Sequence, residues 1–300
     1  MKPTKLADVH EQFKNYLKAN KHSNSTIIAY GKDIGQLVSF LQELKKNHVH
    51  EVIKDDIEAF LAKMSKDGYT PKSISRKLNS TRTFYRFLKI NEYVTDDPSL
   101  LVAHPHYQLA PPRILSPTEY RAFRDAARND PRMSAIIELL LQTGIRIGEL
   151  AAIKISDIRG DKLYISPVEK HEERTIPLNK RAREALNRYL EVRPKTPASG
   201  AKTASDAAKT EGSHLFITKS GKPFLIRNIR TAVERYLRLA EIKNAKVNDL
   251  RHTFVAHHLK HGVSLVLISK MLGHKRLSTT ERYLEYIKDR GKETTVLSEL

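Results

Sequence analysis

The 300-residue chain has room for two domains, and an apolar content of 40% excludes a chain that is disordered throughout. The absence of cysteine excludes a disulfide framework, a thiol nucleophile and a cysteine-ligated metal site, and the sequence shows neither an apolar stretch of membrane-spanning length nor a secretory signal. The 53 Lys and Arg residues against 34 Asp and Glu give a net charge of +19, which favours a polyanionic partner such as nucleic acid. We therefore expect a soluble, cytoplasmic protein that binds a polyanion and does not associate with a membrane.

Residues 1–103 predict a helical bundle. Apolar residues fall at helical spacing in four stretches, and short polar segments connect them. The fourth stretch begins near Pro71, a residue type that favours the first turn of a helix, and it carries a basic cluster. A solvated face and a DNA-facing helix are both consistent with this cluster, whose members are Lys72, Arg76, Lys77, Arg82 and Arg86.

A linker is predicted at residues 104–113, because three prolines in ten residues disfavour both helix and sheet. The second domain then spans residues 114–300. It begins with helices, continues with two short strands at 162–166 and 173–178 around a charged turn, and returns to helices. Residues 194–212 are rich in Ala, Lys, Thr and Ser and predict a flexible surface loop. The expected fold class is therefore mainly α, with a small β-sheet or hairpin in the second domain.

Four short stretches of the second domain carry residues with catalytic chemistry. Singly, each residue has an ordinary structural explanation, such as a helix cap, an ion pair or a core aromatic. Together they form an ordered pattern that separate structural roles do not explain. The pattern consists of Thr143–Leu150 with Arg146 and Glu149, Lys170 in the strand turn, Asn248–His252 with Arg251, and Leu272–His274 followed by Tyr283.

This pattern resembles that of the tyrosine recombinase (phage integrase) family, most closely its compact Xer-type members, over nearly the whole chain. The family has an arginine in a T-G-x-R-x-x-E-L phrase, a lysine on a β-hairpin, an arginine in H-x-L-R-H, a histidine in L-G-H and a tyrosine nucleophile. The resemblance implies a SAM-like core-binding bundle at residues 1–103 and a mixed α/β catalytic domain at 114–300. It implies catalytic roles, with Glu149 and His252 in support, for Arg146, Lys170, Arg251, His274 and Tyr283 as the nucleophile.

The resemblance implies a site-specific recombinase that cuts and rejoins duplex DNA. Tyr283 would form a 3′-phosphotyrosine and free a 5′-hydroxyl, so that rejoining would need no ATP. Two arginines and a histidine suit the negative charge that develops on an attacked phosphate, and a lysine can protonate the leaving oxygen. No acidic cluster typical of a two-metal site accompanies them, so we expect no metal and no other cofactor.

The family also implies partners. Four protomers would act on two DNA sites and exchange strands through a Holliday junction, with both domains of each protomer clamping the duplex. An accessory protein is a further candidate partner. The DNA sequence of the site cannot be read from the chain, because phosphate contacts carry no sequence and base contacts depend on a few side chains.

Two positions depart from the family pattern. Asn248 stands where the family usually has histidine, and an amide cannot exchange a proton at neutral pH. We interpret Asn248 as a tolerated substitution and His252 as a packing or orienting residue. The hairpin also lacks the glycine that is common after Lys170, which leaves Lys154 and Lys162 as weaker alternatives.

Three alternatives remain open from the sequence. Tyr286 is a rival nucleophile, because it would share a helix face with Tyr283, although the spacing from His274 favours Tyr283. Asn248 is compatible with a DNA-binding accessory protein that has the same fold and weak or lost catalysis. A relaxing topoisomerase would use the same nucleophile but would need no specific site.

Overall fold

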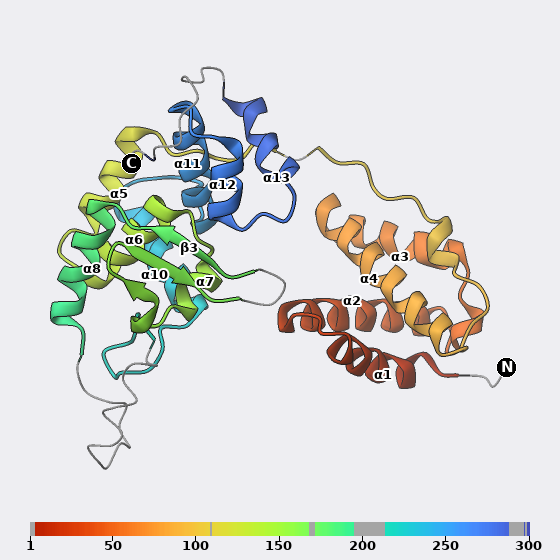
Figure 1. The fold of residues 1–300 in the computed structure, drawn as a ribbon. Coiled ribbons are helices and arrows are strands. Elements are labelled where there is room, and N and C mark those ends of the chain that lie inside the picture. The colour runs from red at the N-terminus through yellow and green to blue at the C-terminus, as the bar shows by residue number, and fades with distance from the viewer. Residues whose placement is uncertain (1–3, 109, 168–171, 195–213, 288–296, 298) are drawn as a thin grey trace, which may run out of the picture. The chain divides into compact units, whose positions relative to one another are not determined.

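The computed structural model describes residues 4–108, 110–167, 172–194, 214–287, 297 and 299–300. The chain divides into two compact units, Met1–Ala110 and Pro111–Leu300, and the division falls inside the proline-rich stretch 104–113. Each unit has its own hydrophobic core, so each has the packing of an independent domain. Figure 1 shows the elements of both units.

In the described residues, the first unit is a bundle of four α-helices and two 3₁₀ helices: α1 Leu6–Ala19, α2 Asn24–Glu43, η1 Val49–Glu51, α3 Lys54–Lys66, α4 Pro71–Ile90 and η2 Pro98–Leu101 (Figure 1). Ser23 caps α2 and Thr70 caps α4, and each side chain accepts a hydrogen bond from a backbone amide of the first turn. On α4, residues spaced three and four apart are buried, namely Ile74, Leu78, Thr81, Tyr85 and Leu88. The predicted helical bundle is confirmed.

The structure corrects one member of the basic cluster on α4. Lys77 is only 1% exposed, and its ammonium group lies 3.1 Å from the carboxylate of Asp33 on α2 and 4.7 Å from the ring centre of Tyr69. A side chain that is buried in an ion pair has no surface to offer a phosphate, so the prediction that Lys77 contacts DNA is wrong. Lys72 and Arg86 are exposed and remain candidates.

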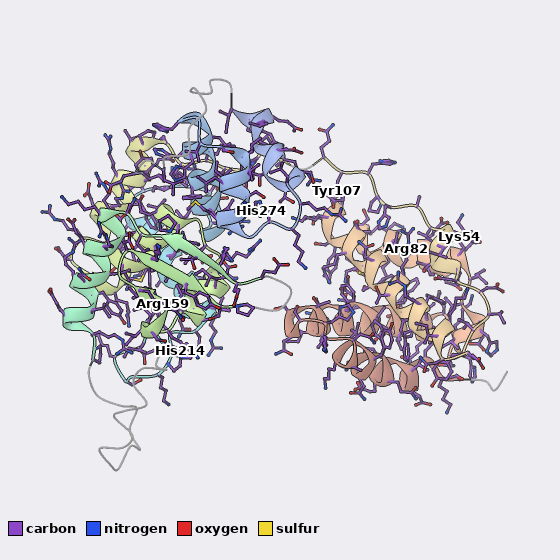
Figure 2. The ribbon with its side chains drawn as sticks, viewed as in Figure 1. Lys54, Arg82, Tyr107, Arg159, His214 and His274 are labelled. Carbon is purple, nitrogen blue, oxygen red and sulfur yellow. The ribbon has the colours of Figure 1, made fainter. Side chains whose placement is uncertain are left out.

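The remaining two arginines of that cluster have partners within the first unit. Arg76 pairs with the same Asp33 carboxylate and keeps 43% of its side chain exposed. Arg82, labelled in Figure 2, donates hydrogen bonds to the carbonyl oxygens of Ser99 and Val102 at 3.3 and 2.8 Å. Both residues therefore have a structural place, and their contact with DNA stays a prediction.

In the part that the structure describes, the second unit consists of helices around a three-stranded antiparallel sheet (Figure 1). The elements before the sheet are α5 Pro117–Ala126, α6 Pro131–Thr143, α7 Ile147–Ala152 and η3 Ile155–Asp157. The strands are β1 Ile158–Arg159, β2 Lys162–Ile165 and β3 Arg174–Pro177. The elements after the sheet are α8 Lys180–Val192, α10 Ile226–Leu239, α11 Val247–Lys260, α12 Leu265–Leu272, α13 Ser278–Glu281 and η5 Arg282–Tyr286.

The sheet follows the predicted hairpin and adds one strand. Leu163 of β2 lies opposite Ile176 of β3, and both side chains are buried, so the inward face of the hairpin belongs to the core. The strand β1 was not predicted, because two residues are too few to show an alternating pattern. The fold class, mainly α with a small sheet in the second unit, is confirmed.

The end of the chain lies within the second unit. Leu300 is 4% exposed, and its carbonyl oxygen accepts hydrogen bonds from Gln142 at 3.2 Å and from Arg124. This contact attaches residue 300 to α5 and α6. None of the described helices is both long enough and apolar enough to cross a lipid bilayer.

Candidate active site

Two glycines turn the chain toward the site. Helix α6 ends at Gly144 with φ +61°, and helix α12 ends at Gly273 with the same φ. A Cβ atom at Gly144 would lie 2.6 Å from the Cδ1 atom of buried Phe254, so both the backbone conformation and the space require glycine. The residues that follow these turns, Arg146 and His274, are candidate site residues.

Two arginines converge on the end of α12. Arg146, the first residue before α7, donates from Nη1 to the carbonyl oxygen of Leu272 at 3.2 Å. Arg251 on α11 donates to the same oxygen from Nη2 at 2.9 Å, and from Nη1 to the carbonyl oxygen of Gly144 at 2.7 Å. The last carbonyls of a helix lack helical partners and carry negative partial charge, which suits guanidinium donors.

The two arginines differ in exposure. Arg251 is 6% exposed, whereas the side chain of Arg146 is 31% exposed. Burial, and next the positive charge of Arg146, lowers the pKa of Arg251 to about 9. Because this pKa still lies above neutral pH, Arg251 keeps its charge at pH 7, and Arg146 presents the more accessible positive charge.

Glu149 offsets part of this positive charge from within the protein. Its carboxylate accepts two hydrogen bonds from Arg174, at 2.8 and 3.0 Å, and one from the backbone amide of Arg146 at 2.8 Å. Burial opposes ionisation, but the hydrogen bonds from Arg174 and Arg146 outweigh it and lower the pKa of Glu149 below its ordinary value. Glu149 is therefore an ionised, buried counter-charge for the arginines.

Arg174 is a residue of the site that sequence reasoning missed. It begins β3 and, besides its pair with Glu149, donates from Nε to the carbonyl oxygen of Met271 at 2.6 Å. Its guanidinium also packs against Gly273, where an added Cβ would lie 3.0 Å from Nη1. The only signal in the sequence was its place at the end of the charged turn, which is weak because exposed hairpins often carry arginine.

His274 joins the arginine pair. It lies between α12 and α13 and is labelled in Figure 2. Its Nε2 atom is 3.0 Å from Nη2 of Arg251, and its Nδ1 atom is 2.8 Å from the hydroxyl of Thr280, a fully buried residue. A guanidinium can only donate, so Nε2 accepts this hydrogen bond. Thr280, which sequence reasoning also missed, fixes the orientation of the ring.

The hydroxyl of Tyr283 contacts His252 and not His274. The hydroxyl of Tyr283 on η5 lies 2.5 Å from Nδ1 of His252 on α11, and Nε2 of His252 lies 2.8 Å from the amide nitrogen of Asn248. Burial raises the pKa of Tyr283, while the charge of Arg251 acts in the opposite direction. Burial also lowers the pKa of His252, so that its ring is neutral at pH 7. The hydroxyl of Tyr286 has no hydrogen-bond partner among the described residues.

The structure thus brings most of the predicted site residues into two connected groups. One group, around the end of α12, contains Arg146, Glu149, Arg251 and His274; the other contains Tyr283, His252 and Asn248.

Lys170 lies outside the described residues, as does nearly all of the predicted loop at 194–212. Lys154 and Lys162 are described and exposed, and neither forms a hydrogen bond or ion pair with the site. Within the described residues, no cluster of three or more His, Asp or Glu side chains could hold a metal ion.

Comparison with known proteins identifies the family. Residues 113–290 match the phage integrase family, and residues 10–92 match its N-terminal SAM-like domain. The chain belongs to the phage integrase family. The tyrosine recombinase XerC of Anoxybacillus flavithermus is 31% identical over 286 residues. The alignment covers 92% of this chain and 92% of the relative. XerC of Bacillus pumilus is 32% identical, with 94% of this chain and 93% of the relative covered.

Solved structures of integrases share the fold. A lambda integrase dimer bound to a COC′ core site has a TM-score of 0.74 and 18% identity, with 99% of this chain and 81% of that chain covered. The Tn1549 transposon integrase in complex with a circular intermediate DNA has a TM-score of 0.72 and 17% identity, with 92% of this chain and 94% of that chain covered. Together with the Xer relatives, these findings confirm the predicted resemblance: the protein is a tyrosine-type site-specific recombinase. Neither the accessory-protein alternative nor the topoisomerase alternative is favoured.

Proposed function

We propose that this recombinase cleaves DNA by attack of the Tyr283 oxygen on a backbone phosphate. The bond to phosphorus forms as the bond to the 5′ oxygen breaks, which leaves a 3′-phosphotyrosine and a 5′-hydroxyl. The phosphate ester keeps the energy of the broken link, so the reverse attack by a 5′-hydroxyl rejoins the strand without ATP. The chemistry uses side chains of the protein alone and needs no metal ion.

The observation that carries this proposal is the convergence of Arg146 and Arg251 on one carbonyl oxygen. Both guanidinium groups already donate to the Leu272 oxygen, at 3.2 and 2.9 Å. A phosphate that is attacked gains negative charge on its non-bridging oxygens, and two fixed guanidinium groups stabilise that charge without reorganising. We propose that the scissile phosphate binds at the exposed side of this pair, next to Arg146.

His274 contributes a further donor in this proposal. Its Nε2 atom now accepts from Arg251, and the hydroxyl of Thr280 lies at Nδ1. While Nε2 accepts from Arg251, the ring proton is on Nδ1 and is donated to the Thr280 hydroxyl. A hydroxyl can also donate, so when a phosphate oxygen replaces the contact between Arg251 and His274, the ring can take the other tautomer and donate from Nε2 to that oxygen.

The leaving 5′ oxygen needs a proton, and we propose that Lys170 supplies it. A lysine ammonium can act as a general acid when it lies within hydrogen-bond reach of the leaving atom. In the sequence the residue comes after β2 and four residues before Arg174, with which β3 begins and which pairs with Glu149 in the site. The described alternatives, Lys154 and Lys162, form no hydrogen bond or ion pair with the described site residues, which favours Lys170.

We propose duplex DNA and other copies of the chain as partners. Solved neighbours include a lambda integrase tetramer bound to a Holliday junction and lambda integrase dimers bound to a core site. By analogy, four protomers would exchange strands between two sites in two steps. The net charge of +19 is spread as +5 on residues 1–103 and +14 on the rest, so both units can bind the DNA backbone, with Lys72 and Arg86 as candidates on α4.

A covalent trapping experiment tests the proposal. The protein is incubated with nicked duplexes that carry candidate recombination sites, so that the cut strand diffuses away and the adduct accumulates. We expect a denaturant-resistant protein–DNA adduct that persists in Tyr286→Phe and is absent in Tyr283→Phe. The reverse pattern would overturn the nucleophile assignment, and loss of the adduct on addition of a chelator would contradict the metal-free mechanism.

A further inference from the structure

The Tyr283 oxygen has one close polar neighbour that the proposed mechanism does not yet use. His252 lies one residue after Arg251 on α11, and its Nδ1 atom is 2.5 Å from the phenol oxygen. The two rings are tilted by 44° with centres 5.6 Å apart, so they are not stacked, and the hydrogen bond is their closest polar contact. Because the nucleophile must become a phenolate, its hydrogen-bond partner bears directly on the reaction.

Asn248 determines which ring nitrogen of His252 carries the proton. Its amide nitrogen lies 2.8 Å from Nε2 of His252, one helical turn earlier on α11. An amide nitrogen only donates, so Nε2 must accept and cannot carry a proton. In a neutral imidazole the proton is then on Nδ1, and it points at the Tyr283 oxygen. His252 is thereby set as a hydrogen-bond donor to the nucleophile and cannot also be the base that removes its proton.

We propose that His252 is a catalytic residue that donates from Nδ1 to the phenolate of Tyr283, and that Asn248 is the positioning residue that holds this tautomer. The inference rests on the proposed function of Tyr283 as nucleophile. It gives Asn248 a role of its own at the position where the sequence pattern departs from histidine. A buried phenolate needs such help, because burial raises the pKa of Tyr283.

The same donor serves both chemical steps. In cleavage the phenol proton passes to water, the Tyr283 oxygen forms its bond to phosphorus, and the bond to the 5′ oxygen breaks as that oxygen takes a proton from the general acid. In rejoining a 5′-hydroxyl attacks, loses its proton to the same group, and the bond from phosphorus to the Tyr283 oxygen breaks. The phenolate leaves with the electron pair while His252 donates to it, and His252 keeps its own proton throughout.

Two substitutions of His252 separate a donor from a base. His252→Asn places an amide nitrogen near the position of Nδ1, so it can donate but cannot take up a proton at neutral pH. His252→Phe keeps the aromatic packing and removes both abilities. We expect single-turnover cleavage of nicked duplex to fall by about 100-fold in His252→Phe, the range seen when an oxyanion donor is removed, and by less than about 10-fold in His252→Asn.

The matched controls are His261→Asn and His261→Phe, on an exposed histidine at the end of the same helix. Both should cleave at the wild-type rate, and all four variants should bind DNA and unfold in urea as the wild type does. Equal loss in His252→Asn and His252→Phe, with folding intact, would mean that His252 acts as a base and would overturn the donor assignment. Wild-type rates in His252→Phe would remove His252 from the mechanism. Absence of any adduct in the wild type would instead contradict the proposed function itself.

The tautomer can be measured without activity. In ¹⁵N spectra of the full-length protein, we expect the His252 ring to show a protonated Nδ1 and an unprotonated Nε2, with the signal assigned by its loss in His252→Asn. Asn248→Ala should shift this ring toward the Nε2–H tautomer and lower the cleavage rate. A wild-type ring with its proton on Nε2, or an unchanged ring in Asn248→Ala, would contradict the role of Asn248.

Discussion

Arg146 and Arg251 donate hydrogen bonds to the same backbone oxygen, that of Leu272, from two different helical segments. Two like charges at one point repel each other, and the ionised Glu149, which pairs with Arg146 and Arg174, offsets part of this repulsion. The carbonyl oxygens at a helix end carry only a partial negative charge, which is smaller than the charge of a phosphate. The pair is therefore held in place before DNA binds, and a phosphate oxygen can replace the carbonyl oxygen.

Arg251→Lys should stop most cleavage and spare DNA binding. A lysine has one ammonium group, so it cannot keep the hydrogen bonds to Gly144 and Leu272 and also meet a phosphate as a planar fork does. We expect the single-turnover rate on nicked duplex to fall by about 100-fold or more, the scale of losing a transition-state donor. Arg238→Lys, on an exposed arginine of α10, is the matched control and should cleave normally. Parallel losses of binding and cleavage in Arg251→Lys would contradict the proposed role.

Gly144→Ala should destabilise the second unit more than Gly160→Ala. Both glycines have a left-handed backbone, with φ of +61° and +62°, which costs alanine roughly 1–2 kcal/mol. At Gly160 a Cβ would meet nothing within 4 Å, whereas at Gly144 it would lie 2.6 Å from Phe254. Overpacking adds roughly 1–3 kcal/mol, so Gly144→Ala should lose roughly 2–5 kcal/mol in urea unfolding. Equal losses in the two variants would show that Phe254 moves aside without cost.

Lys72 and Lys77 should separate DNA affinity from stability, although they lie on the same helix. Lys72→Ala removes an exposed charge, so DNA affinity should fall and the slope of log affinity against log salt should decrease by about 1, with the urea midpoint unchanged. Lys77→Ala leaves the buried Asp33 with one partner fewer, and stability should fall by about 3 kcal/mol. Titrations at several salt concentrations and urea unfolding measure the two effects. A reduced salt slope in folded Lys77→Ala would restore Lys77 as a DNA contact.

How far the sequence predicted the site depends on the kind of contact involved. Arg146, Arg251 and His274 were predicted because each lies in a short local phrase that resembles one of the family, and the structure brings them together. Arg174 was missed because its role arises only when β3 packs beside Glu149, a contact between segments that no local pattern records. Lys77 was misread for the same reason, since its partner Asp33 lies on another helix.

The role of His252 shows the same limit at the nucleophile. The phrase that contains Arg251 placed His252 in the site, but it gave no sign that the ring reaches η5 and Tyr283. Asn248 and His252 are four residues apart, which is one turn of a helix, so their contact could have been predicted from helical spacing. What could not be read from the sequence was the direction of the hydrogen bonds, which depends on how α11 and η5 pack.

The stability of the second unit should fall as the pH drops below 6.5, and His258 should account for much of the loss. His258 is 1% exposed, its Nδ1 atom has no hydrogen-bond partner among the described residues, and its ring packs against Phe254. Burial, and next the charges of His257 and His261, lowers the pKa of His258 from 6.5 to about 3. Its folded pKa is therefore below its unfolded pKa, so the unfolded chain binds more protons in this range. The stabilisation is complete above pH 6.5 and is lost as the pH falls toward 3, at up to about 1.4 kcal/mol for each pH unit.

His258→Phe should remove this dependence, because phenylalanine fills a similar volume, packs against Phe254 and binds no proton. Urea unfolding at pH 7, 6, 5 and 4, followed by circular dichroism, gives the free energy of unfolding at each pH. We expect the wild type to lose stability more steeply than His258→Phe between pH 6 and 4, and the exposed control His106→Phe to follow the wild type. The same slope in all three proteins would show that His258 becomes protonated within the folded core or that another group carries the acid sensitivity. Since Phe254 also packs at Gly144, a folded core that protonates His258 would shift the turn before Arg146, and the cleavage rate would fall over the same pH range.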